Sequence, residues 1–280
     1  MPKLSVITIN YNNRDGLKKT IESVVNQTCR DFEYLVIDGG STDGSVDVIK
    51  EYADRIDYWV SEPDKGIYNA MNKGIDVANG GYCLFLNSGD YFIRKNVLDE
   101  CLPYLDGVDI VTGCVQVSYG DVWYVHKSIT LNLFYEGDSL NHPASFIKTC
   151  LLKKYHYDES LKIVSDWKFF IQTLIVDCCG LKPIDVIVTV FDANGISSVN
   201  VKRISQERDF VLKEMFPSRL LEDYSMNHTY DFRKLFFMIE KSKLHRLMYV
   251  INVVILKVLN LFTGRAKWIS GFSTKERNRL

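Results

Sequence analysis

The sequence predicts an α/β protein with a mostly parallel central sheet, followed by a helical C-terminal region. Residues 4–86 alternate short β-branched runs with segments in which apolar residues recur at helical spacing. This order is typical of parallel strands joined by crossover helices. From about residue 201 the apolar pattern stays helical to the end of the chain. We therefore expect an α/β domain over residues 1–200 and a helical region over residues 201–280.

Four apolar runs predict the strands in the first half of the chain. They are "LSVITI" (4–9), "YLVI" (34–37), "DYWVS" (57–61) and "YCLFL" (82–86). Between these runs, apolar residues recur at helical spacing from Leu17 to Val25, from Val46 to Ala53 and from Ile67 to Ala78. Such spacing gives each segment one apolar face, and it therefore predicts three helices that cover the sheet.

The second half of the chain has a less regular pattern. The runs "DIVTGCVQV" (109–117) and "VWYVHK" (122–127) predict two strands, which we expect to form a hairpin around "SYGD". The stretch "VSDWKFFIQTLIV" (164–176) predicts a helix, and "IDVIVTVF" (184–191) predicts a late strand. Because no low-complexity linker separates these elements, we assign them to the same domain.

Composition and charge limit the possible classes of protein. The 280 residues are 46% hydrophobic and 25% charged, which suits a globular protein with a sizeable core. The net charge of −1 gives no indication of a nucleic-acid partner. The charge is unevenly distributed, because residues 234–280 hold ten Lys or Arg and two Asp or Glu. A basic tail therefore follows an acidic body.

The cysteines and the N-terminus indicate the compartment. The seven cysteines are odd in number and include no C-x-x-C pair, so we expect free thiols in a reducing environment rather than disulfides or a zinc site. The opening stretch "MPKLSVITIN" has no charged segment followed by a long apolar one. We therefore expect no signal peptide and a cytosolic chain.

Three polar loops directly follow predicted strands: "NYNN" (10–13), "DGGSTDGS" (38–45) and "NSGD" (87–90). In open parallel sheets, ligands bind beyond the carboxyl ends of the strands, so these loops predict the functional site. None of them has the phosphate-binding spacing G-x-G-x-x-G or G-K-[ST]. A bound nucleotide would need another partner for its phosphates, and a divalent cation held by Asp90 would supply one.

Several motifs in order carry a resemblance to a known family. The stretches "SVITINYNN", "VIDGGSTDGS", "EPDKGIYNAMNKGIDVANGGYCLFLNSGD", "HPASF" and "SDW" resemble those of family 2 glycosyltransferases, which have the GT-A fold. The likeness covers about residues 3–195. It implies inverting transfer of a sugar from a nucleotide-sugar, UDP- or dTDP-linked, to a saccharide or lipid-linked acceptor. Members of this kind build capsule, exopolysaccharide or O-antigen.

The resemblance also implies roles for individual residues. Those that match nucleotide-sugar-binding positions are Thr8, Asn10, Tyr11, Asp38, Lys65, Gly66, Asn69, Asn87, Ser88 and His142. Asp38 matches the carboxylate that accepts an N–H from a uracil-type base, and family members often have a second aspartate where this chain has Gly39. Lys65 would offset phosphate charge. His142 matches a recurrent histidine on the acceptor and diphosphate side.

The D-x-D metal site of the family is altered in this chain. The usual "DSDD" is replaced by "NSGD" (87–90), so that Gly89 takes the place of the usual metal-binding aspartate. The resemblance implies Mg²⁺ or Mn²⁺, with Asp90 as the remaining carboxylate. One carboxylate and a diphosphate are enough to bind Mg²⁺, because this ion keeps several of its waters in protein sites. Direct ligation by Asp90, a water in the gap and weak metal dependence all stay open.

Asp166 in "SDW" matches the aspartate of the family's "ED" pair, with Ser165 in place of the glutamate. The resemblance implies that Asp166 is the general base, which takes the acceptor hydroxyl's proton during attack on the anomeric carbon. A structural role is the alternative for each carboxylate. Asp38 and Asp90 are also typical turn residues, and Asp166 is a typical acid of a first helical turn. We expect Asp43 to be a helix cap.

Two other functions are open at this point. A non-catalytic nucleotide-sugar-binding protein is one, because the D-x-D motif is degraded. A nucleotidyltransferase is the other, because such enzymes also bind nucleotides on a parallel sheet. Such an enzyme would favour a glycine-rich, basic loop after the first strand, and "NYNNRDG" is a poor match. Activity against any nucleotide-sugar would distinguish an enzyme from a binding protein.

The stretch "LHRLMYVINVVILKVLNLF" (244–262) predicts an amphipathic helix, with apolar residues on one half of its helical wheel and basic and polar ones on the other. Lys257 and two asparagines interrupt it, whereas a transmembrane span needs about 20 mostly apolar residues. We expect this helix to bind an anionic membrane surface, which would make the protein cytoplasmic and peripheral on the inner face of the plasma membrane. Packing on the catalytic domain or an oligomer contact is the alternative.

Overall fold

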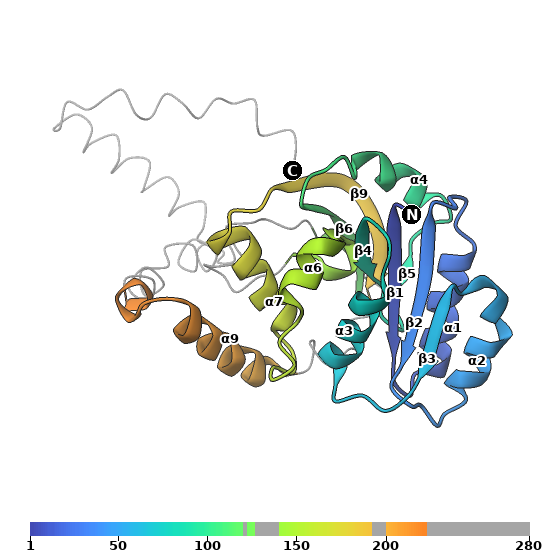
Figure 1. The fold of residues 1–280 in the computed structure, drawn as a ribbon, viewed down its shortest axis with the longest axis horizontal. Coiled ribbons are helices and arrows are strands. Elements are labelled where there is room, and N and C mark those ends of the chain that lie inside the picture. The colour runs from blue at the N-terminus through green and yellow to red at the C-terminus, as the bar shows by residue number, and fades with distance from the viewer. Residues whose placement is uncertain (120–121, 127–139, 192–199, 223–280) are drawn as a thin grey trace, which may run out of the picture. The chain divides into compact units, whose positions relative to one another are not determined.

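The structure, a computed structural model, describes residues 1–119, 122–126, 140–191 and 200–222. The chain divides into two compact units, Met1–Ser218 and Arg219–Leu280, and nearly all described residues belong to the first unit. Within the first unit, strands and helices alternate along the chain from the N-terminus (Figure 1). The α/β class predicted from the sequence is therefore confirmed.

The described elements are as follows. The strands are β1 (Leu4–Asn10), β2 (Phe32–Asp38), β3 (Tyr58–Ser61), β4 (Tyr82–Phe85), β5 (Tyr91–Phe92), β6 (Ile110–Tyr119), β7 (Val122–His126), β8 (Ser145–Lys148) and β9 (Leu181–Phe191). The α-helices are α1 (Arg14–Val25), α2 (Ser45–Glu51), α3 (Ile67–Val77), α4 (Val97–Cys101), α6 (Thr149–Tyr155), α7 (Ser165–Phe170) and α9 (Val201–Met215). Short 3₁₀ turns are η1 (Ala53–Arg55), η2 (Leu102–Tyr104) and η3 (His142–Ala144), and η4 (Ile171–Val176) is a π-helix.

The strands form one sheet in the order β3-β2-β1-β4-β8-β6-β9-β5, with β7 paired to β6. The part formed by β3, β2, β1 and β4 is entirely parallel, as the alternating sequence pattern predicts. Beyond β4 the sheet is mixed, because β8 pairs antiparallel with both β4 and β6, while β6 and β9 are parallel. The carboxyl ends of β1, β2 and β4 therefore lie at the same edge of the sheet.

Helices cover both faces of the sheet, with α1 and α2 on one side and α3, α6 and α7 on the other (Figure 1). All seven residues of β1 are buried, because alternate side chains enter the two cores. Val6 packs in the core under α1, and Ile7 packs in the core under α3. Burial on both faces explains why the parallel strands form continuous apolar runs in the sequence rather than alternating ones.

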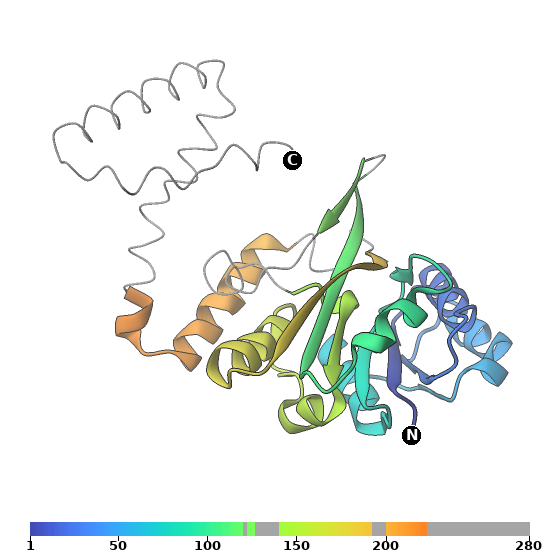
Figure 2. The same cartoon turned by 90° about the horizontal axis from the view of Figure 1, so that it is seen from above.

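The second half of the chain contains the predicted hairpin and helix. β6 and β7 pair antiparallel from Val115 to His126, and the hairpin extends away from the parallel part of the sheet (Figure 2). The predicted helix over residues 164–176 is present as α7 followed by the π-helix η4. Helix α9 packs in the first unit, because Val211 is completely buried in the same core as α3 and α7. The domain boundary at residue 200 stays a prediction.

The predicted membrane-surface helix at residues 244–262 lies outside the described residues. Within the described ranges, no helix combines the length and apolar character needed to cross a membrane. Cys29, Cys83, Cys101, Cys150, Cys178 and Cys179 are free thiols, and Cys83, Cys101 and Cys114 are buried.

Candidate active site

The polar loops that follow β1, β2 and β4 lie against one another, as their positions in the sequence predict. Asn12 joins the first two loops, because its backbone N–H donates to Ser41 Oγ at 2.8 Å and its Oδ1 accepts from Thr42 N at 2.9 Å. Asn13 caps α1 through Gly16 N and also donates from Nδ2 to the carbonyl of Ser88 at 3.1 Å. Side-chain amides thus connect all three loops at the carboxyl edge of the sheet.

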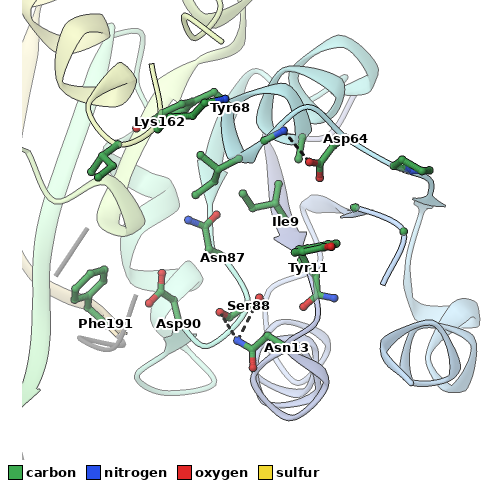
Figure 3. A pocket seen from close by; sticks show the side chains of 18 residues that line it. Ile9, Tyr11, Asn13, Asp64, Tyr68, Asn87, Ser88, Asp90, Lys162 and Phe191 are labelled. Carbon is green, nitrogen blue, oxygen red and sulfur yellow. Dashed lines mark hydrogen bonds between the residues drawn. The ribbon is translucent and has the colours of Figure 1, made fainter. Parts of the chain in front are cut away.

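A cavity of about 940 Å³ opens at this edge (Figure 3). A volume of this order suits a ligand as large as a nucleotide-sugar. Half of the residues assigned from the family resemblance line it: Asn10, Tyr11, Gly66, Asn87, Ser88 and Asp90. Tyr11 is 66% exposed, so its ring is available for stacking with an aromatic ligand.

The other assigned residues lie behind the cavity or beside it. They are Thr8, Asp38, Lys65, Asn69, His142 and Asp166. The Thr8 hydroxyl bonds to Tyr34 Oη of β2 at 3.0 Å and to the carbonyl of Leu86, the residue after β4, at 2.8 Å, so it joins these segments within the core. Asn69 accepts from Lys65 N and donates to Glu159, which makes it part of the support for the start of α3. For Thr8 in particular, the structure gives a role in packing rather than at the cavity surface.

Asp38 is completely buried and holds the β2 loop together. Its Oδ1 accepts from Asn10 Nδ2 at 2.7 Å and from Ser41 Oγ at 2.6 Å, and its Oδ2 accepts from Ser41 N at 2.9 Å and Ser61 Oγ at 2.6 Å. Burial alone would raise the pKa of Asp38, but the hydrogen bonds from Ser41, Ser61 and Asn10 outweigh it and lower the pKa below its ordinary value. Asp38 is therefore an ionised carboxylate beneath the cavity.

Asp43 is placed differently from Asp38, at the surface before α2. The cap position of α2 is Gly44, and Asp43 lies one residue earlier. Its carboxylate accepts from Ser45 N at 3.1 Å and from Arg14 N at 2.9 Å, so it binds the first turns of both α1 and α2. Contrary to the expectation from the sequence, Asp43 is therefore not the cap residue of α2, although its contacts are structural ones.

The turn over residues 87–90 explains the altered D-x-D motif. Gly89 has a φ of 107°, which glycine adopts without strain and an aspartate does not. Thr20 of α1 fixes the turn, because its hydroxyl accepts from Gly89 N at 3.0 Å and donates to the carbonyl of Asp90 at 2.7 Å. The backbone therefore favours glycine at position 89 and directs the Asp90 side chain toward the cavity (Figure 3).

The oxygens around this turn fit a divalent cation that also binds a diphosphate. Asp90 is 5% exposed, and the buried Asn87 Oδ1 has no hydrogen-bond partner within the described part of the chain. Carboxylate and amide oxygens are ligands that Mg²⁺ and Mn²⁺ accept. The described residues contain no group of three or more His, Cys, Asp or Glu that could hold a metal alone. The donor set therefore suits a metal–diphosphate rather than a bare ion.

Asp166 lies at the first turn of α7, directly behind a residue that lines the cavity. Tyr68 of α3 donates its hydroxyl to Asp166 Oδ1 at 3.0 Å. Burial, and after it the charge of Asp166, raises the pKa of Tyr68 well above its ordinary value, so the hydroxyl stays protonated. Asp166 is itself only partly buried.

His142 lies deeper in the same region, away from the cavity surface. Its Nε2 bonds to Tyr157 Oη at 2.8 Å, and its ring stacks on Phe85 with centroids 5.2 Å apart. Burial lowers the pKa of His142, although the charge of Asp166 acts in the opposite direction. The imidazole is therefore neutral near pH 7, and it packs beneath the site.

Sequence reasoning missed several residues that line the cavity, chiefly Asp64, Tyr68, Lys162 and Phe191. Lys162 carries an exposed ammonium group beside Gly66, because a Cβ at Gly66 would lie 3.6 Å from Lys162 Nζ. Its backbone N–H is held by Glu207 of α9 at 3.1 Å. Lys162 precedes the "SDW" motif by only three residues, and Asp64 belongs to the "EPDKG" motif, so both were within reach of the sequence.

A mixed α/β sheet with this cavity at the ends of its parallel strands has the arrangement expected of the GT-A class. The comparisons with known proteins place it more narrowly: the chain belongs to glycosyltransferase family 2, whose model, described as "Glycosyl transferase family 2", matches residues 5–159. The resemblance found in the sequence is thereby confirmed.

Two curated relatives show the same membership. An uncharacterized glycosyltransferase of Mycobacterium tuberculosis is 34% identical over 211 residues, which cover 70% of this chain and 78% of the relative. A PGL/p-HBAD biosynthesis glycosyltransferase of Mycobacterium bovis is 27% identical over 207 residues, which cover 69% of this chain and 78% of the relative.

Solved structures share the fold at low sequence identity. TarS 1-349 of S. aureus in complex with UDP-GlcNAc superposes with a TM-score of 0.57 at 20% identity, covering 68% of this chain and 58% of that one. The mannosyltransferase PcManGT from Pyrobaculum calidifontis, in complex with GDP-Man and Mn²⁺, gives a TM-score of 0.54 at 16% identity, with 68% and 56% covered. The chain thus spans less than two thirds of the length of either structure.

Proposed function

We propose that this glycosyltransferase transfers a sugar, with inversion, from a uridine or thymidine diphosphate donor to a hydroxyl of a saccharide or lipid-linked acceptor. One observation carries the proposal. The cavity has an exposed aromatic ring, Tyr11, on one side and the buried carboxylate of Asp90 on the other (Figure 3). A base stacked on Tyr11 would therefore extend its diphosphate toward Asp90.

Asp90 and Asn87 would hold Mg²⁺ or Mn²⁺ against the diphosphate. When bound, such a cation neutralises negative charge that develops on the leaving phosphate oxygen. Lys162 lines the same cavity and would supply a further positive charge to the phosphates. The complex of PcManGT with GDP-Man and Mn²⁺ supports metal use in this fold, and that of TarS supports a UDP-linked donor.

Asp166 would accept the proton of the acceptor hydroxyl. Its Oδ1 is fixed by Tyr68 at 3.0 Å, while its Oδ2 has no hydrogen-bond partner among the described residues and would take the proton. A single base on the acceptor side and a stabilised diphosphate on the other side suffice for a single displacement, which inverts the anomeric centre. The proton leaves the attacking hydroxyl, and the glycosidic oxygen of the donor leaves with the diphosphate.

The acceptor and the place of the reaction are also part of this proposal. Capsule, exopolysaccharide or O-antigen synthesis would require a saccharide or lipid-linked acceptor at the cytoplasmic face of the plasma membrane. The excess of ten Lys or Arg over two Asp or Glu in residues 234–280 supports attraction to an anionic membrane. The enzyme would then be cytoplasmic and peripheral.

A donor screen tests the proposal. Thermal shift with UDP-, dTDP- and GDP-sugars, each with Mg²⁺, with Mn²⁺ and with EDTA, would be followed by measurement of nucleotide release. We expect a UDP- or dTDP-sugar to stabilise the protein in a metal-dependent way. We also expect the protein to release the nucleotide slowly from that sugar. Stabilisation without any turnover on a panel of acceptors would instead favour the non-catalytic binding protein, which the single carboxylate at Asp90 keeps as the second candidate.

A further inference from the structure

The carboxylate of Asp38 is not available to a ligand in the cavity. It has no exposed surface, and its two oxygens already accept four hydrogen bonds, from Asn10, Ser41 and Ser61. A carboxylate has about four acceptor positions. A base could reach Asp38 only by displacing a serine hydroxyl and opening the β2 loop, which would leave a buried donor unpaired.

A second carboxylate occupies the space that a side chain at position 39 would fill. A Cβ built on Gly39 would lie 2.3 Å from Asp64 Oδ2 and 3.1 Å from Tyr11 Cδ2. Asp64 comes from the segment before α3, and its Oδ1 is fixed by Gly66 N at 2.8 Å. Oδ2 has no hydrogen-bond partner in the described ranges of the chain, and Asp64 lines the cavity next to Tyr11 (Figure 3).

Charge decides which part of a nucleotide can lie beside Asp64. Two carboxylates with oxygens facing the cavity, Asp64 and Asp90, lie on opposite sides of it (Figure 3). A diphosphate beside Asp64 would be repelled by the carboxylate, because both groups are negatively charged. A neutral ring with an N–H group would gain a charge-assisted hydrogen bond instead. A base stacked on Tyr11 would present its edge to this carboxylate.

We infer that Asp64, rather than Asp38, is the carboxylate that recognises the base of the donor, by accepting the N3–H of uracil or thymine. The inference rests on the proposed function, since it concerns the same cavity. Cytosine has no hydrogen on N3, so its lone pair would face the Asp64 carboxylate. Asp64 thereby selects uridine and thymidine nucleotides over cytidine nucleotides, and Gly39 leaves room for it.

Calorimetric titration of the full-length chain with UDP, dTDP, CDP and GDP in the presence of Mg²⁺ tests the inference. We expect wild type to bind UDP or dTDP at least about 10-fold more tightly than CDP. Asp64→Asn should weaken UDP binding about 10- to 100-fold, the loss typical of one charge-assisted hydrogen bond. CDP binding should not weaken, because the new amide can donate to cytosine N3, and the preference for UDP should disappear.

Three further variants ensure that the test does not rest on Asp64→Asn alone. Glu62→Gln removes one negative charge from the same segment, where Glu62 pairs with Lys73 at 2.7 Å outside the cavity lining, and we expect unchanged UDP and CDP affinities. Gly39→Ala should displace the terminal oxygen of Asp64, weaken UDP binding and reduce the preference over CDP. The double variant of Gly39→Ala and Asp64→Asn should bind UDP no more weakly than Asp64→Asn.

The outcomes separate this inference from the proposed function. A wild-type chain that binds UDP well, together with an Asp64→Asn variant that keeps the ratio of UDP to CDP affinity, contradicts the inference alone. Equal weakening of UDP and CDP also contradicts it, because the carboxylate would then contact the ribose. Preferential binding of GDP contradicts the assignment to uracil or thymine while leaving sugar transfer intact. A chain that binds no nucleotide contradicts both.

Discussion

Tyr68 donates its hydroxyl hydrogen to Asp166 Oδ1 over 3.0 Å and so joins the first turn of α3 to the first turn of α7. Tyr68 is 4% exposed, and its pKa lies well above the ordinary value because of burial and of the charge on Asp166. The hydroxyl therefore remains a donor throughout the physiological pH range. This bond holds the proposed general base in one orientation at the back of the donor cavity.

Tyr68→Phe should reduce turnover while leaving donor binding intact. The variant removes only the hydroxyl, so that Asp166 keeps its charge and loses its orientation. We expect kcat to fall about 10-fold, in line with one hydrogen bond to a charged group. The KM for the donor should change less than about twofold. A larger KM with unchanged kcat would place Tyr68 in donor binding rather than in positioning Asp166.

Asp90→Ala should weaken metal-dependent nucleotide binding more than Asn87→Ala does. A carboxylate binds Mg²⁺ or Mn²⁺ directly and carries charge, whereas an amide oxygen is a weaker ligand. Calorimetry of UDP with Mg²⁺ and with EDTA measures the metal-dependent part for each variant. Equal losses, or no loss in either variant, would show that the turn over residues 87–90 does not hold the metal.

Asp38→Asn should destabilise the fold rather than act on catalysis. Asp38 has a lowered pKa in the folded state, so its ionised form adds stability at pH values above its unfolded pKa, and this stability is lost as the pH falls through the folded value. At pH 7 we expect a loss of about 2–4 kcal/mol, because the amide cannot accept all four hydrogen bonds. Urea unfolding at pH 7 and in the acid range measures it.

The acid range provides the check on that prediction. Wild type should lose stability between roughly pH 4 and the lowered folded pKa of Asp38, and the variant should lose less over the same interval. Parallel pH dependence in the two proteins would mean that Asp38 does not carry the effect.

The C-terminal tail should bind anionic vesicles in the full-length protein. The stretch over residues 244–262 combines an apolar face with basic residues, and each nearby Lys or Arg adds about 1 kcal/mol of attraction. Co-sedimentation should be strong with anionic vesicles at low salt and weak with neutral ones. Ile251→Glu, on the apolar face, should reduce it. A protein that stays in the supernatant with both kinds of vesicle would show that the helix is a packing or oligomer contact.

The sequence predicts the parallel part of the fold well because its signals are local. Continuous apolar runs such as Leu4–Asn10 indicate strands buried on both faces, and the polar loops after them indicate the edge where a ligand binds. The mixed pairing of β8 is not predictable in the same way. It depends on contacts between residues far apart in the chain, with β4 on one side and β6 on the other.

The sequence predicts several of the residues that form the site, but not how they lie relative to one another. Asn87 and Asp90 line the cavity as expected, because both lie in the polar loop that follows β4. Asp38 also lies at the end of a strand, yet nothing local shows that Ser61, from the next strand, would donate a hydrogen bond to its carboxylate. Asp64 lies in a motif that the sequence shows, but its position against Gly39 is known only from the structure. Spatial proximity between separate loops is the information that the sequence alone does not contain.

The comparison of Asp166→Asn with wild type tests the central claim most directly. Transfer from the donor found in the screen and UDP affinity would be measured in parallel, with Glu214→Gln on α9 as a carboxylate control that pairs with Lys168 instead. We predict a loss of about 100- to 10,000-fold in transfer for Asp166→Asn, with UDP affinity and the control nearly unchanged. Near-normal transfer by Asp166→Asn would contradict the account and remove Asp166 from the mechanism.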